Sequence, residues 1–183
     1  MDPSLLTVTE LTNGLRSGAA GRYPSEAAVE LLIRHWTWLA RPGFARDCVW
    51  APAGESDVLF IRWDRLIAHA SSEQVDLPPA DRAVALIAAH LGAWTDPQAD
   101  WPGLERIPPL SWLLASLPRA EVALVLAAIS HAAGTHDQVD HVGEPGEGDG
   151  ADRWRVTATS PRLPLGPLYQ WPDPALPGLA DPA

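Results

Sequence analysis

The chain has 183 residues and a net charge of −10 at pH 7, with 13 basic residues that are all arginine and 23 acidic ones. This length suits one domain, and the acidic balance argues against direct nucleic-acid binding, which needs clustered cations. No apolar run is long enough to span a membrane, and the single cysteine, Cys48, excludes an internal disulfide, so we expect a cytoplasmic protein.

The N-terminal segment predicts one short helix over residues 7–16. Thr7 and Glu10 have the spacing of a capping box, and Leu11 and Leu15 fall on one face. The glycine-rich residues that follow form a flexible joint. We therefore interpret residues 1–22 as an arm outside the core domain.

Residues 25–41 show the clearest amphipathic pattern. Ser25 is a suitable N-cap, one stripe is apolar and the opposite stripe carries Glu30 and Arg34 in the favourable order. A helix over this whole range, ending at Pro42-Gly43, is the prediction.

Residues 44–63 predict a β-hairpin, because two β-rich runs flank a turn at residues 52–57. Two strands alone are marginal, so we expect residues 153–159 to supply a third strand.

Four further helical segments follow. Asp64 begins a short one, residues 80–91 form a stronger one, and leucines mark another over residues 110–117. Residues 118–133 are apolar on nearly every side and stop at Gly134, which predicts a buried central helix. The fold class is thus mainly α with a small β-hairpin or three-stranded sheet, organised as a compact helical domain over residues 23–136.

Three segments of this domain resemble a group of small helical proteins from GC-rich bacteria whose function is not assigned. They are Ser25-Glu26-Ala27-Ala28-Val29-Glu30-Leu31-Leu32-Ile33, Phe60-Ile61-Arg62-Trp63-Asp64 and Ala127-Ala128-Ile129-Ser130-His131-Ala132-Ala133-Gly134. The resemblance covers about residues 24–136 and implies one domain, but no activity and no site residues.

The C-terminal part changes in composition. Residues 137–152 combine acidic residues with glycines and predict a flexible, solvated loop. Residues 153–183 predict a strand and then a proline-rich tail. The tail is apolar enough that we expect it to pack on the core or to bind a partner.

The strongest candidate for chemistry is a group of histidines and aspartates. A helix resuming at His136 would place His136 and Asp140 four residues apart on one face, and Asp137 and His141 likewise. The candidate metal ligands, for zinc or another divalent ion, are His131, His136, Asp140 and His141. His131 could equally serve at the negative end of a helix dipole, and His35, His69 and His90 lie at the edges of apolar helix faces.

No nucleophile, base and orienting group converge in the sequence, so we identify no catalytic residue and lean away from an enzyme. The nine tryptophans favour an interface instead. The leading hypothesis is an accessory protein that binds another protein. That partner could be a second copy, in a homodimer through Trp36 and Trp38. The candidate interface residues are Trp36, Trp38, Tyr169 and Trp171. The alternatives are a metal-dependent hydrolase using the His/Asp group and an acidic decoy of a DNA-binding protein.

Overall fold

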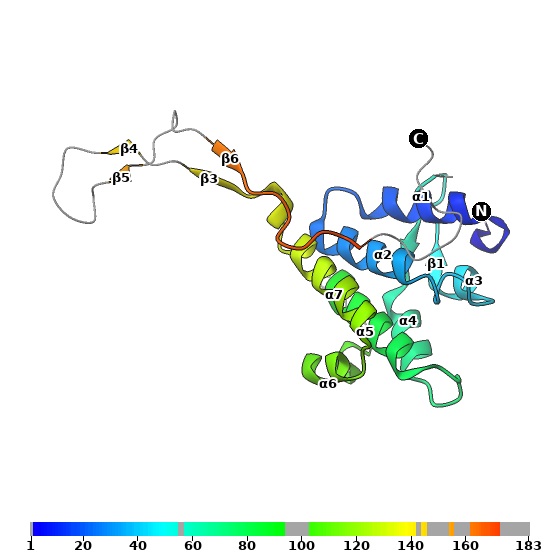
Figure 1. Cartoon of the computed structure of the whole chain (residues 1–183). Coiled ribbons are helices and arrows are strands. Elements are labelled where there is room, and N and C mark those ends of the chain that lie inside the picture. The colour runs from blue at the N-terminus through cyan, green and yellow to red at the C-terminus, as the bar shows by residue number, and fades with distance from the viewer. Residues whose placement is uncertain are drawn as a thin grey trace.

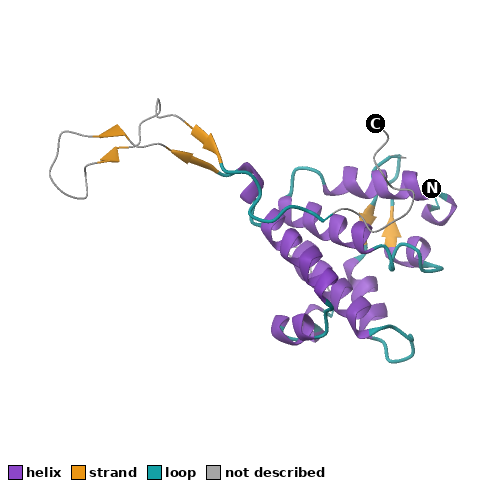
Figure 2. Cartoon of the chain, in the orientation of Figure 1, coloured by secondary structure: helices purple, strands orange, loops and turns teal. Residues whose placement is uncertain are grey.

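A computed structural model describes residues 2–54, 57–93, 103–141, 144–145, 154–155 and 162–172. These residues form a mainly helical domain, as predicted, with a small two-stranded sheet (Figures 1 and 2). The α-helices in this part of the chain are α1 (Val8–Ala19), α2 (Tyr23–His35), α3 (Phe44–Cys48), α4 (Trp63–Ser71), α5 (Pro79–Ala93), α6 (Leu110–Ala115) and α7 (Arg119–Ala132).

The remaining elements are short. The 3-10 turns are η1 (Pro3–Leu5), η2 (Leu104–Arg106) and η3 (Thr135–Asp137). Antiparallel pairs join β1 (Val49–Trp50) to β2 (Phe60–Ile61), β3 (Val139–His141) to β6 (Arg162–Pro164), and β4 (Glu144–Pro145) to β5 (Trp154–Arg155). Strands β3 to β6 lie away from the helices in Figure 1.

The core lies around α2 and α5. Helix α2 packs against both α5 and α7, and α4 packs on α5. All residues 83–89 of α5 are buried. Four of these seven residues are alanines, and such small side chains allow neighbouring helices to approach closely.

Helix α7 is therefore not the central helix that its composition predicts. Val125 and Ala128 are buried against the core, but Ile129 is exposed. The helix ends as expected, because Gly134 follows it with φ 68°. The apolar residues on every side of α7 therefore do not mean that every side is buried, since one side of this helix borders an apolar groove.

The N-terminal helix belongs to the core and is not a separate arm. The capping box between Thr7 and Glu10 is present, which confirms that prediction. Leu15 is buried, and the backbone N–H of Leu59 donates to the carbonyl of Gly14. A Cβ at Gly18 would lie 1.9 Å from the carbonyl oxygen of Leu59, so glycine is required for this close contact.

Helix α2 ends six residues earlier than predicted. Trp36 adopts φ 68°, which is unusual for a residue with a Cβ and stops the helix. The chain can then turn Trp38 into the core, where its indole N–H donates to the carbonyl of Asp81 at 2.8 Å. Tertiary packing therefore overrides the helical pattern of residues 36–41.

The predicted hairpin is only partly present. Residues 44–48 form α3, and the strands are reduced to β1 and β2. The predicted third strand is wrong, because β5 pairs with β4 and not with this sheet. Within residues 137–152, which were predicted as a flexible loop, the described residues include β3 and β4.

None of the helices in the described ranges combines the length and apolarity needed to cross a bilayer.

Candidate functional site

Polar side chains form a row along α2 where this helix faces α1 and α7. Tyr23, Glu26, Glu30 and Arg34 recur every three or four residues, which places them on one side of the helix. The neighbouring elements pair with each member of this row.

The aromatic end of the row brings together Tyr23, His131 and His136. The two imidazole rings stack with centroids 4.2 Å apart, and the Tyr23 ring meets His136 edge-on at 4.7 Å. The Tyr23 hydroxyl donates to Asp137, and this bond is the main cause that raises the pKa of Tyr23. Gly134 makes the approach possible, because a Cβ there would lie 2.9 Å from the Tyr23 ring.

The two carboxylates of the row are already hydrogen-bonded. Glu26 accepts from the backbone N–H of Gly21 at 2.7 Å, and its other oxygen lies 2.9 Å from Nε2 of His131. Glu30 accepts from Arg16 and, at 2.7 Å, from Arg34. Burial alone would raise the pKa of Glu30, but the bonds and charges of both arginines outweigh burial and keep it below its usual value.

The C-terminal residues 165–172, which we name the strap, cross this cluster. The backbone N–H groups of Leu168 and Tyr169 donate to Oγ1 of Thr135 and Oγ of Ser130. Arg34 donates to the carbonyl of Pro172 at 2.9 Å and lies over the Trp171 ring, 5.3 Å from its centroid. The strap is thus held in its middle by Ser130 and Thr135 and at its end by Arg34.

A pocket of about 270 Å³ remains beneath the strap. Its walls include Arg16, Glu30, Arg34 and His131, with Trp171 at one side. Since the carboxylates are satisfied by neighbouring donors, the polar groups of this pocket mainly serve to hold α1, α2, α7 and the strap together.

The predicted metal ligands are not brought together by a helix. His131 and His136 do meet, but residues 135–137 form a 3-10 turn and residues 139–141 a strand. The spacing of four between His136 and Asp140 therefore does not place them on one helix face, which corrects the geometric basis of that site. The side chains of Asp140 and His141 lie outside those that the structure describes.

No group of three or more His, Cys, Asp or Glu side chains within the described ranges could hold a metal ion. The metal-dependent hydrolase and the acidic decoy of a DNA-binding protein stay predictions.

The predicted interface residues occupy different environments. Trp38 is only 3% exposed, so it cannot contribute to an outer surface, and that assignment is corrected. Trp36 and Trp171 are half-buried and pack on the core. Tyr169 is exposed on the strap, beside the still more exposed Leu168.

A second buried polar group was missed by sequence reasoning. The side chain of His35 is 5% exposed, and its Nε2 lies 3.4 Å from Asp81 Oδ1. Within the described part of the chain, Nδ1 of His35 and Oε2 of Glu121 are buried without a hydrogen-bond partner. These residues come from α2, α5 and α7, and no local signal links them.

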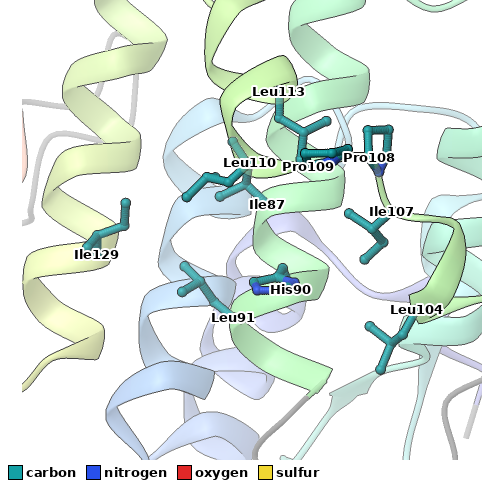
Figure 3. Close-up of a pocket in the computed structure, with 10 residues that line it drawn as sticks. All are labelled: Ile87, His90, Leu91, Leu104, Ile107, Pro108, Pro109, Leu110, Leu113 and Ile129. Carbon is teal, nitrogen blue, oxygen red and sulfur yellow. The ribbon is translucent and has the colours of Figure 1, made fainter.

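An apolar groove lies on the other side of α7. Figure 3 shows its lining side chains, with Ile129 from α7 facing α5, α6 and the segment that precedes α6. The groove has a volume of about 280 Å³ and is lined by Ile87, His90, Leu91, Leu104, Ile107, Pro108, Pro109, Leu110, Leu113 and Ile129. Of these, Leu110 and Ile129 are exposed large hydrophobic residues.

Comparisons with known proteins give no relative: no protein-family model, curated protein or solved structure matches the chain.

Proposed function

We propose that this chain is a non-enzymatic, cytoplasmic accessory protein that binds another protein through the outer side of the strap. The observation that carries the proposal is the exposure of apolar side chains on a backbone that is held in place. Leu165, Leu168 and Tyr169 are all exposed, and Leu168 is 74% exposed. We name these three residues the strap face.

The strap face is an unfavourable surface unless something covers it. Each large apolar side chain gains about 1.5–3 kcal/mol when it leaves water. The strap backbone cannot turn these side chains inward, because Leu165, Leu168 and Tyr169 all donate their N–H groups to Gln138, Thr135 and Ser130. A partner that buries them would therefore gain affinity without having to order the strap first.

The surroundings of the strap face favour a protein partner. Residues 163–172 contain no charged side chain, although charged residues make up 20% of the chain. Val139, also exposed, lies next to Pro164 across the β3–β6 pair and extends the apolar area. An uncharged apolar patch on an ordered backbone resembles the centre of a protein–protein interface.

Site-specific photo-crosslinking in the native host tests this proposal. Benzoylphenylalanine at position 168 should capture one defined protein. The same residue at position 5 should not, although Leu5 is 83% exposed in η1. The captured protein is then purified and its affinity for the chain is measured by calorimetry.

Leu168→Asp should weaken that affinity at least about tenfold, since tenfold corresponds to about 1.4 kcal/mol and the lost burial is larger. Leu5→Asp is the matched control and should change the affinity little. Equal capture at positions 5 and 168, or an affinity unchanged by Leu168→Asp, would refute the proposal.

A further inference from the structure

The groove beside α6 adjoins a long surface segment of the helical domain that carries no charge. Residues 107–118 contain no charged side chain, whereas the residues on either side, Arg106 and Arg119, are both charged. Most of this segment is exposed or half-buried; among residues 107–118 only Leu113 is buried. Surface charges of one sign repel other copies of an acidic protein and keep it from associating, and this segment has no such charges.

The groove has the size for a large side chain. Its volume of about 280 Å³ lies just below the roughly 300–1,000 Å³ of pockets that enclose drug-sized molecules. Its lining is apolar apart from His90. An aromatic side chain presented by a protein surface would fill it without leaving a buried charge unpaired.

Trp112 is such a side chain, and it belongs to the same surface. It is 70% exposed on α6, while Leu110 and Leu113 of the same helix line the groove. A tryptophan this exposed is unusual, since burial of its large ring is strongly favourable. Tryptophan is also the residue type most enriched among the anchors of interfaces.

We propose that the groove is filled by Trp112 of a second copy of this chain, so that two α6 helices pack across a two-fold axis. A surface that carries both an aromatic projection and a matching groove is self-complementary, which is what a closed two-fold dimer requires. Glu105 and Arg106, both exposed beside the uncharged segment, lie as an ion pair within one chain (Arg106 Nε to Glu105 Oε1, 3.5 Å), so together they bring no net charge to this end of the contact. This dimer is independent of the partner bound at the strap face.

Salt provides a distinctive signature of this dimer. Each copy carries a net charge of −10, so two copies repel one another over distances of about the Debye length. The contact itself is apolar and is not weakened by ions. Dimerisation should therefore become stronger between about 0.05 M and about 0.5 M salt, as screening shortens the repulsion.

Sedimentation equilibrium of the full chain, from about 1 to about 100 µM, measures the association. We expect a monomer–dimer equilibrium that Trp112→Ala weakens at least about tenfold. Leu110→Asp, which places a charge in the groove, should abolish it. Leu168→Asp is the control, because it changes the strap face and should leave the dimer intact.

Disulfide trapping tests the contact itself. A chain with Trp112→Cys is mixed with a chain with Ile129→Cys, and we expect a disulfide-linked heterodimer. Pairing Trp112→Cys with Leu5→Cys should give much less product. A monomer at every concentration, a dimer that Trp112→Ala leaves unchanged, or equal trapping at positions 5 and 129 would each overturn the proposal.

Discussion

The imidazole rings of His131 and His136 lie face to face, 4.2 Å between centroids and 11° from parallel. His131 is held by Glu26 on α2, whereas Nδ1 of His136 is buried without a hydrogen-bond partner in the described part of the chain. His136 therefore combines a favourable ring contact with a buried nitrogen that lacks a hydrogen bond. It fixes the turn after α7 against α2.

This arrangement predicts opposite results for two substitutions of His136. His136→Ala removes the ring and should lower the free energy of unfolding by about 1–2 kcal/mol, since an aromatic pair contributes about 0.5–1.5 kcal/mol beyond its buried area. His136→Phe keeps the ring contact and removes the unsatisfied nitrogen, so the protein should be at least as stable as the parent. Urea unfolding of both variants measures the difference, and equal destabilisation would contradict this account.

The strap depends on the hydroxyl of Ser130. Ser130→Ala removes the acceptor for the Tyr169 N–H and should lower the free energy of unfolding by about 1–2 kcal/mol, because this partly buried N–H loses its hydrogen bond. Amide hydrogen exchange at Tyr169 should become faster. Ser17→Ala, at an exposed position of α1, is the control and should change stability by less than about 0.5 kcal/mol. Unchanged exchange at Tyr169 would show that the strap is held by other contacts.

His35 predicts a pH dependence of stability. Burial is the main cause that lowers the pKa of His35, and the carboxylates of Asp81 and Glu121 oppose it only in part. Because the unfolded chain then binds a proton more readily than the folded one, stability should be complete above the ordinary histidine pKa of about 6.5. It should fall as the pH drops through that value towards the pKa of the folded state.

Urea unfolding between about pH 5 and about pH 8 measures this slope. His35→Gln should remove the part of the slope that His35 contributes, while His69→Gln, outside this buried group, should leave that part in place. An identical slope in the parent and in His35→Gln would exclude His35 as its source.

Cys48 should be unreactive in the folded protein. Burial, followed by the charges of Asp47 and Asp64, raises the pKa of its thiol to about 12, and the side chain is buried at the end of α3. The thiolate is the reactive form, so Ellman's reagent at about pH 8 should label the native chain only as fast as it unfolds. The same chain in urea should react at once, and rapid labelling without urea would contradict the prediction.

Features that depend on residues close together in the sequence were predicted correctly. The capping box of Thr7 and Glu10 and the stop at Gly134 both appear as predicted. Residues 44–48 were misread, because their β-rich composition gives way to one helical turn that buries Phe44 and Cys48. Short elements of this kind are set by the surface on which they pack.

The candidate site was less accessible to sequence reasoning. His131 and His136 were identified, but Tyr23 and Asp137 are 114 residues apart and no local pattern connects them. The same holds for Trp112 and the groove, since a tryptophan in a leucine-rich helix reads as core. Only the packing of α6 on α5 shows which of its apolar side chains stay in water.

The contact between Arg34 and the carbonyl of Pro172 joins positions 138 residues apart. Because a ribosome makes the chain from its N-terminus, α2, α5 and α7 can pack before the strap exists. Ser130, Thr135 and Arg34 then gain their partners at residues 168, 169 and 172 only after the strap has been made, so this face is completed later than the packing of the helices.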